Sequence, residues 1–321
     1  MARTHFLPDE QAHYKWDTSN EPVLIVDSGD TVVLWTRDIS DNQITPDGDA
    51  SQLTNFDWDR AYPLNGPIAI QGAAPGDTLK IEVLDVHTQG WGWTGVLPGF
   101  GLLADDFPEA YLRTFDLSNG EVAYLREDIA IPLEPYFGTM GVCPAGATAR
   151  SVVQPGRFGG NMDIRQLGRG STLYLPIEVD HALFSCGDAH GAQGDGEVCG
   201  TGIESPMFAS LRFTLEKEHP VPGPQYFTPA PLTGRVDNAP FFATTGVGGD
   251  LYAAAQDAVR FMIEHLGVKH GLSPEDSYVL CSLAVDLKIS EIVDGGQYIV
   301  SALLPEGIFS QDPRPSGFAA P

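Results

Sequence analysis

Short runs of apolar residues dominate the first third of the chain and predict β-strands. The runs cover residues 23–26, 31–35, 67–70 and 78–84, and each is bounded by Gly, Pro, Asp or Asn. Such short, branched-residue-rich runs are typical of strands and too short for helices. The stretch 91–134 mixes aromatic and acidic positions without a period, so we expect a long irregular excursion there.

The central part of the chain continues the β pattern around one unusual loop. Strands are expected at 172–177, 200–204 and 210–215, and the first two of them flank a segment rich in glycine and acidic residues. Residues 220–231 carry many prolines, which predicts a connection or a sheet edge.

Helical spacing occurs only near the C-terminus. Apolar residues return every three or four positions from 251 to 266, with Asp250 as a candidate N-cap and Gly267 as a candidate stop. Ser273 and Pro274 then predict the start of a second helix through about residue 284.

A strand pair at 287–292 and 297–304 is expected to follow, around a turn at 294–296. The fold class predicted is therefore α+β, predominantly β, in packed sheets or a barrel-like sandwich with two helices in the C-terminal third.

Length and charge limit the possible organisation and partners. At roughly 150 residues per domain, 321 residues suggest two regions, and we expect a β-rich part at 1–135 and a part at 136–321, packed as one unit. The chain carries 18 Lys and Arg against 43 Asp and Glu, yet is 42% hydrophobic, which indicates an acidic globular protein. Nucleic-acid and membrane partners are not expected, because phosphate binding rests on clustered cations.

Compartment and standard motifs narrow the field further. Residues 1–9 do not have the pattern of a secretory signal, and no run reaches the roughly 18 apolar residues of a membrane span. Four irregularly spaced cysteines without a CxxC pair favour the reducing cytoplasm. The chain also lacks GxSxG, HExxH, SxxK and GxxxxGK motifs.

The segment 183–204 carries the densest chemistry in the sequence. Asp188 and His190 alternate, so in an extended segment both side chains face one ion or one water. Asp195 and Glu197 repeat the alternation, and Glu204 follows on the next expected strand. Carboxylates with a neutral imidazole suit zinc, manganese or calcium. The alternative is a turn-rich loop whose Asp side chains bond their own backbone.

Two further groups are weaker candidates. Asn161 and Asp163 follow two glycines and alternate onto one face, which fits either a ligand-binding strand or an Asx-turn. Asp38 ends a strand and is a candidate ligand or a surface-turn residue.

Cys186 and Cys199 raise the possibility of a thiolate nucleophile. A Cys-Glu-Lys amidase needs a lysine, and the chain has none between Lys80 and Lys217. Small buried hydrophobic residues are therefore the default expectation for both cysteines.

At these residues the sequence resembles the acetamidase/formamidase family, in the family's order over nearly the whole chain. The block GDAHGAQGDGEVCGTGIE at 187–204 is the most specific match. The other matching segments are Asn65-Gly66-Pro67, Pro75-Gly76-Asp77, Trp91-Gly92-Trp93, Gly160-Asn161-Met162-Asp163 and Tyr278-Val279-Leu280-Cys281-Ser282.

The resemblance implies hydrolysis of a short aliphatic amide to a carboxylate and ammonia, in a β-rich fold with a metal site. The family's acidic and histidine positions carry over to Asp38, Asp163, Asp188, His190 and Glu204. We expect a divalent ion, zinc before calcium or manganese, at Asp38, Asp188 and His190.

In the resulting hypothesis of metal-assisted hydrolysis, Glu204 is the first choice for the base, with Asp163 or Glu197 as substitutes. Asn161 or a glycine amide would stabilise the oxyanion. The alternatives are a cysteine-nucleophile amidase and a β-rich module that binds a metal or small molecule without turnover. Exposed apolar β edges and the family resemblance predict a homo-oligomer.

Overall fold

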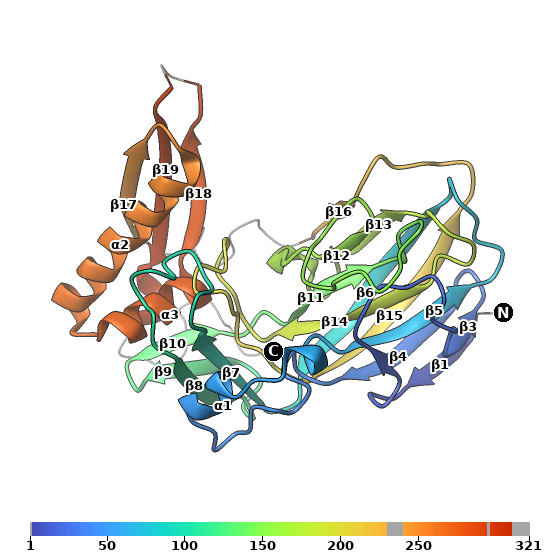
Figure 1. The fold of residues 1–321 in the computed structure, drawn as a ribbon, viewed down its shortest axis with the longest axis horizontal. Coiled ribbons are helices and arrows are strands. Elements are labelled where there is room, and N and C mark those ends of the chain that lie inside the picture. The colour runs from blue at the N-terminus through green and yellow to red at the C-terminus, as the bar shows by residue number, and fades with distance from the viewer. Residues whose placement is uncertain (1, 230–239, 294–295, 310–321) are drawn as a thin grey trace.

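The computed structural model describes residues 2–229, 240–293 and 296–309, and two large sheets dominate it (Figure 1). The first sheet has the order β1-β4-β15-β6-β13-β16, antiparallel except for the parallel pair of β1 and β4. Its strands are β1 (Thr4–Leu7), β4 (Thr31–Thr36), β15 (Met207–Glu216), β6 (Thr78–Thr88), β13 (Thr172–Pro176) and β16 (Gln225–Phe227).

The second sheet has the order β12-β11-β14-β5-β2, with β3 added in parallel to β5. Its strands are β12 (Gly159–Asn161), β11 (Tyr136–Gly141), β14 (Phe184–His190), β5 (Leu64–Ile70), β2 (Ala12–His13) and β3 (Leu24–Val26). All residues of β5, β11 and β14 are buried, so these strands are covered on both faces.

The two sheets pack face to face over one hydrophobic core. β4 alternates buried and half-buried residues, as expected for a strand with one face on the core. Phe184 of the second sheet meets Phe213 of the first at 5.0 Å between ring centroids. This is a sandwich, one of the two β arrangements that the sequence predicted, and the α+β, mostly β class is confirmed.

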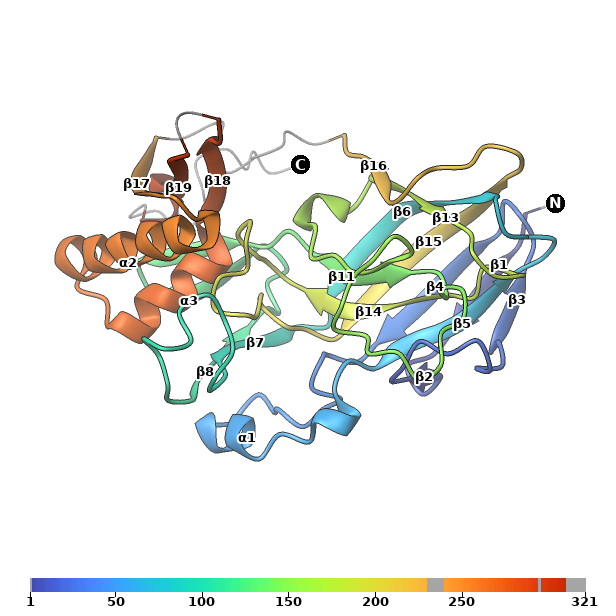
Figure 2. The same ribbon diagram turned by 45° about the horizontal axis from the view of Figure 1, so that its top comes forward.

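A second lobe lies beside the sandwich and has its own hydrophobic core (Figure 2). It contains two hairpins, a three-stranded sheet in the order β17-β19-β18, and two long helices. Its elements are β7 (Trp91–Val96), β8 (Tyr111–Asp116), β9 (Val122–Arg126), β10 (Ile129–Pro132), β17 (Phe241–Gly248), α2 (Leu251–His270), α3 (Pro274–Ala284), β18 (Asp286–Glu291), β19 (Tyr298–Pro305) and η3 (Glu306–Phe309).

The starts of both long helices are where the sequence predicted them. The Asp250 carboxylate accepts the amide of Ala253, and the Ser273 hydroxyl accepts the amide of Asp276. The predicted stop at Gly267 is wrong, because a helix interior tolerates glycine at a cost of about 1 kcal/mol. The helix ends instead at Gly271, whose φ of 64° is the left-handed conformation of a C-cap.

Two other predictions about local structure are wrong. The stretch 91–134 forms the hairpins β7–β8 and β9–β10. Its mixture of aromatic and acidic residues has no alternation from which these strands could be predicted. The expected strand at 200–204 is an irregular segment with isolated bridges from Glu204 to Trp93 and His190. Its backbone turns at Gly200, where φ is +89°.

The remaining elements are short. They are α1 (Ala50–Thr54), η1 (Trp58–Arg60) and η2 (Arg165–Leu167), none of which the pattern predicted. The strand pair β18–β19 is confirmed, whereas residues 294 and 295 of its predicted turn lie outside the described residues. The proline-rich stretch supplies the edge strand β16, and residues 230 and 231 also lie outside the described part.

Residues from both predicted regions contribute to the second core, which takes in 96–133 together with 192–203 and 254–308. The division of the chain at residue 135 stays a prediction. Among the described residues, no helix combines the length and hydrophobicity needed to cross a bilayer.

Candidate active site

The end of β14 points from the sandwich toward the second lobe and carries Asp188 and His190 (Figure 1). Asp188 has a φ of 49°, so the strand is locally distorted where it leaves the sheet. Gly138 on the neighbouring β11 makes this possible, since a Cβ there would lie 2.4 Å from Asp163 Oδ1 and 3.1 Å from Asp188 Oδ2. Asp188 and His190 therefore face one point, as predicted from the sequence, and they do so at a distorted strand end.

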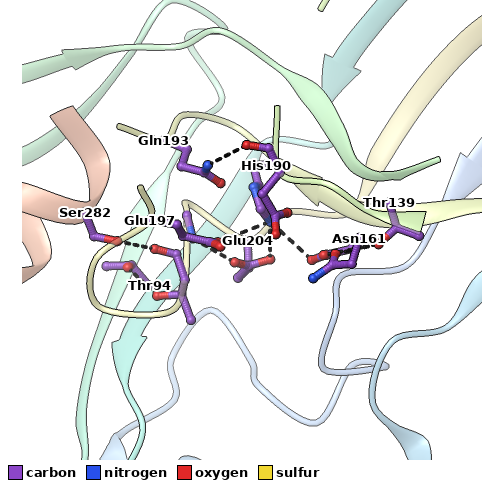
Figure 3. A network of polar contacts seen from close by, with 12 residues as sticks. Thr94, Thr139, Asn161, His190, Gln193, Glu197, Glu204 and Ser282 are labelled. Atoms are coloured by element: carbon purple, nitrogen blue, oxygen red, sulfur yellow. Dashed lines mark hydrogen bonds and ion pairs between the residues drawn. The ribbon is translucent and has the colours of Figure 1, made fainter. Parts of the chain in front are cut away.

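The loop after β14 returns two more carboxylates to the same point. Glu204 bridges to His190 and Trp93, and its Oε1 accepts the amide of Gly202 at 2.9 Å. Glu197 has a φ of 42°, another left-handed residue in this loop. Figure 3 shows Glu197 and Glu204 converging on His190 from one side.

One imidazole nitrogen faces all of these acids. His190 Nε2 lies 3.2 Å from Asp188 Oδ1, 3.3 Å from Glu204 Oε2 and 3.8 Å from Glu197 Oε1. The His190, Asp188 and Glu204 side chains are at most 2% exposed. Such a concentration of negative charge away from water is costly unless a cation compensates it.

The opposite nitrogen of the ring is fixed by a chain of three hydrogen bonds. The Gln193 amide nitrogen donates to the backbone oxygen of Asp163 at 3.0 Å, which leaves Gln193 Oε1 to accept the Tyr136 hydroxyl at 2.5 Å. Since the Tyr136 proton is used there, its oxygen accepts from His190 Nδ1–H at 2.8 Å. In the neutral ring the lone pair is consequently on Nε2, facing the carboxylates.

The acids of the cluster have strongly perturbed proton affinities. Burial raises the pKa of Asp163 to about 7 and that of Glu204 to about 7. Burial likewise raises the pKa of Glu197 well above its ordinary value, with Asp163 adding to the effect. Burial alone would lower the pKa of His190, but the charges of Glu204 and other neighbours raise it well above 6.5. In the absence of a metal, a proton on Nε2 thus offsets part of the charge.

The donor set fits a metal ion. Two overlapping groups, Asp188-His190-Glu204 and Asp163-His190-Glu197, each place three donor atoms within 4.8 Å of one another. Two buried oxygens in them, Asp163 Oδ1 and Glu204 Oε2, have no hydrogen-bond partner. Because His190 offers only Nε2, one imidazole serves one ion, and nitrogen with carboxylate oxygen suits zinc or manganese.

Asn161 and Asp163 enter the site from β12 and the turn after it. Asn161 Oδ1 accepts the Thr139 hydroxyl at 2.6 Å, and Thr139 also lies 3.4 Å from Asp188 Oδ2. Asp163 has a φ of 49°, which turns the chain after the two glycines. The structure therefore brings together five of the six residues predicted for the site: Asn161, Asp163, Asp188, His190 and Glu204.

Asp38 is the sixth, and the structure does not bring it into either donor group. Its buried carboxylate accepts the amides of Ser40 at 2.9 Å and Asn42 at 3.2 Å, and the Trp93 indole at 3.1 Å. The Ser40 hydroxyl donates to it as well. These donors occupy the carboxylate, and they anchor the neighbouring Ile39, which faces the site.

The cysteine alternative lacks support from the geometry. Cys186 and Cys199 are fully buried in the two hydrophobic cores. Burial raises the pKa of both thiols, the opposite of what a nucleophilic thiolate requires. Of the described residues that line the cavity, none is a cysteine.

A cavity of about 260 Å³ opens above the carboxylates. Its polar lining consists of Asn161, Asp163, Asp188, Glu197 and Glu204. Its remaining lining is Ile39, Tyr62, Phe100, Val153, Pro155 and Gly200. Burial raises the pKa of Tyr62 well above 10, so its hydroxyl remains protonated.

Sequence reasoning missed Tyr136, Gln193 and Tyr62. Gln193 lies inside the glycine-rich block, but its partner Tyr136 precedes it by 57 residues. Tyr62 follows an unrelated loop and reaches the site with a φ of 58°. Only the pairing of β11 with β14, in which Tyr136 is opposite His190, reveals the first of these contacts.

Fold and site together define a β-sandwich protein with a buried histidine–carboxylate centre. The acetamidase/formamidase family model matches residues 3–152 and 144–311, so the chain belongs to this family. Family membership was predicted from the motifs, and it confirms a hydrolase that acts on linear amides.

Several relatives are similar over most of their length. A formamidase from Methylophilus methylotrophus is 28% identical, covering 96% of this chain and 92% of the relative. A γ-lactamase structure from Delftia acidovorans has a TM-score of 0.87 at 25% identity, covering 96% and 92%. An acetamidase structure from Bacillus halodurans has a TM-score of 0.68 at 32% identity, covering 94% and 97%.

Proposed function

We propose that the protein hydrolyses short aliphatic primary amides to a carboxylate and ammonia by metal-assisted attack of water. One observation carries the proposal: a His190 ring fixed by Tyr136 directs Nε2 at three carboxylates, 3.2 to 3.8 Å away. The relatives named formamidase and acetamidase support the substrate class.

Asp188, His190 and Glu204 would hold the cation, because their donor atoms form the fully buried group. A divalent ion there would polarise the amide carbonyl and lower the pKa of a water from 15.7 toward about 7. Glu204, the first choice for the base from sequence, is better placed as a ligand. Its Oε1 already accepts the Gly202 amide, and its Oε2 faces His190.

Asp163 is then the best-placed base. Its Oδ1 is buried without a hydrogen-bond partner and its side chain lines the cavity, so it can take a proton from water and return it to the leaving amine. Glu197 belongs to the same donor group, and burial raises its pKa as well, so Glu197 is the substitute for the base.

Asn161 would orient the reacting amide. Its Oδ1 is engaged by Thr139, and this fixes the direction of its amide nitrogen, which lies 3.5 Å from the Val153 oxygen at the cavity wall. A donor held in this way can stabilise the developing oxyanion.

The test combines metal content with ammonia release. Purified enzyme should contain about one divalent ion per chain by mass spectrometry and release ammonia from short amides, and chelation should abolish the activity. Asp188→Asn and His190→Ala should lose both properties. If these variants keep metal and full activity, the ligand assignment is wrong.

The same assay separates the alternatives. Activity that resists chelators but is abolished by thiol alkylation would establish a cysteine nucleophile instead. Bound metal without release of ammonia from any amide would indicate a binding module.

Asp163→Asn tests the base separately from the metal. The variant removes the proton acceptor but keeps the shape of the side chain, so we expect kcat to fall by about 10²- to 10⁴-fold. Metal content should remain near that of the wild type. Unchanged kcat with normal metal content would assign the base elsewhere, with Glu197→Gln as the next variant.

Zinc as the native metal, the homo-oligomer and the cytoplasmic location remain predictions. Metal analysis of protein purified without added ions checks the first, and light scattering checks the second. Cell fractionation checks the third.

A further inference from the structure

The cavity is larger than the smallest amides require. Its volume is about 260 Å³, many times the roughly 10–15 Å³ that a cavity needs to hold one water. Formamide has three non-hydrogen atoms and acetamide four. Either would fill only part of this space.

The lining consists of two chemically distinct groups of residues. One group presents the oxygens of Asp163, Asp188, Glu197 and Glu204, together with Asn161. These carboxylates accept hydrogen bonds, so they suit the two N–H donors of an unsubstituted amide nitrogen. The carbonyl is directed at the cation, as proposed above, which leaves the acyl substituent for the other group.

The other group is apolar and comes from separate parts of the chain. Ile39 and Tyr62 are neighbours in it, because the Tyr62 amide donates a 2.9 Å hydrogen bond to the Ile39 backbone oxygen. Val153 and Pro155 also line it and come from the segment before β12. A hydrocarbon group placed here gains free energy by leaving water.

Phe100 completes the apolar group at the mouth of the cavity. It lies between Gly99 and Gly101, whose φ angles of 79° and 99° require glycine. Its ring packs against Gly200, where a Cβ would lie 2.5 Å from Phe100 Cδ1. Although packed in this way, the side chain is 43% exposed, so it can cover a substrate group entering from solvent.

We propose that the preferred substrates are primary amides whose acyl group carries about three to six apolar carbon atoms, with Phe100 and Val153 as the specificity-determining residues. The inference rests on the proposed function and deepens it by naming the substrate class. The amide nitrogen must be unsubstituted, because a substituent would displace an N–H donor and place carbon among the carboxylates.

A substrate series tests the proposal. From formamide through acetamide to butyramide, kcat/KM should rise, with a gain of about tenfold between acetamide and butyramide. N-methylbutyramide, followed by release of methylamine, and 2-pyrrolidinone, followed by formation of the ring-opened 4-aminobutanoate, should be at least about tenfold slower than butyramide. A decline along the series, or faster hydrolysis of 2-pyrrolidinone, overturns the assignment.

Variants assign the effect to the cavity wall. Phe100→Ala should lower the ratio of butyramide to acetamide kcat/KM, whereas Phe6→Ala, an exposed phenylalanine on β1, should leave that ratio unchanged. Val153→Trp fills the cavity and should reverse the ratio in favour of acetamide. Ratios that remain at the wild-type value in both cavity variants overturn the role of these residues.

Binding separates this inference from the proposed function. If no amide is turned over, the proposed function fails, and the shift in melting temperature with each amide then tests the cavity by itself. A larger shift with butyramide than with acetamide, lost in Phe100→Ala, supports the assignment. Equal shifts with both amides overturn it.

Discussion

His190 shows how one side chain depends on its neighbours for its chemistry. Tyr136 accepts from Nδ1–H because its own proton is donated to Gln193, and Gln193 is oriented by the backbone of Asp163. The same chain of bonds therefore fixes the tautomer of His190 and connects the ring to the segment that carries Asp163, the proposed base. The alternation of Asp188 and His190 was readable from sequence. The contact between the Tyr136 hydroxyl and His190 could not be predicted in this way, because Tyr136 lies on another strand.

Tyr136→Phe should weaken metal binding without removing a ligand. Loss of the hydroxyl leaves His190 Nδ1–H and Gln193 Oε1 without their partner, and we expect the metal dissociation constant to rise about 10- to 100-fold. Activity should recover in part at high metal concentration. Tyr124→Phe, at an exposed tyrosine on β9, is the control, and equal metal affinity in both variants would contradict the role of Tyr136.

At the scale of elements, Arg165 joins the segments that carry Asp163 and Glu197. Its side chain is 4% exposed, and it pairs with Asp286 at 2.9 Å, Asp195 at 3.1 Å and Glu134 at 3.3 Å. Arg165 follows Asp163 by two residues, and Asp195 precedes Glu197 by two. The ion pairs therefore tie the turn after β12 to the loop after β14, and both to β18 of the second lobe.

Arg165→Met should destabilise the protein by about 3 to 5 kcal/mol, because it removes the cation shared by three carboxylates. Thermal unfolding measures this, and Arg165→Lys should restore part of the loss. Arg260→Met is the matched control, since Arg260 is 39% exposed in its pair with Asp106 and should contribute less than about 1 kcal/mol. Equal losses of stability in the two Met variants would contradict the role of Arg165 in joining these segments.

Elements with local signals were predicted well, and those held by distant contacts were not. The N-caps Asp250 and Ser273 each accept the backbone amide three residues further along the chain. The local sequence is therefore sufficient to locate both helix starts. The hairpin β7–β8 is different. Trp93 is buried there, and its indole donates to Asp38, 55 residues away. A contact between residues so far apart leaves no periodic pattern of apolar residues in the local sequence.

The whole molecule concentrates part of its negative charge at the junction of the two lobes. His190 ends a strand of the sandwich, and Ala192, Val198 and Ile203 of the following loop belong to the core of the second lobe. The site thus lies where the two hydrophobic cores meet. Most of the net charge of −25 lies elsewhere, but these few acids are held away from water.

Stability should consequently depend on pH in the cation-free protein. The folded pKa values of Asp163 and Glu204, about 7, exceed their ordinary values of 3.8 and 4.5, so the folded state binds more protons between these limits. Unfolding free energy then falls as pH rises from about 4 to about 7. His190 adds in the same direction, because the stabilisation from its raised pKa is lost as pH rises through the folded value.

Melting temperatures measured with and without zinc or manganese check this. In chelator the melting temperature should fall by a few °C between about pH 5 and pH 7.5, and saturating metal should reduce the fall, because it favours the ionised carboxylates. A melting temperature that rises over this range in chelator would contradict the buried, perturbed cluster.

The sequence by itself determined the β-rich class, both helix starts, the family and the identity of most of the acids at the site. These depend on period, capping and short motifs, which act within a few residues of chain. Only the tertiary structure decided which acids meet. Asp38 lies outside the donor groups, because its carboxylate accepts hydrogen bonds from Ser40, Asn42 and Trp93. Tyr136, which the sequence did not predict, contacts His190 from the neighbouring strand. Proton affinity and donor geometry depend on burial and on partners far apart in the chain, and these exist only once the two cores have packed.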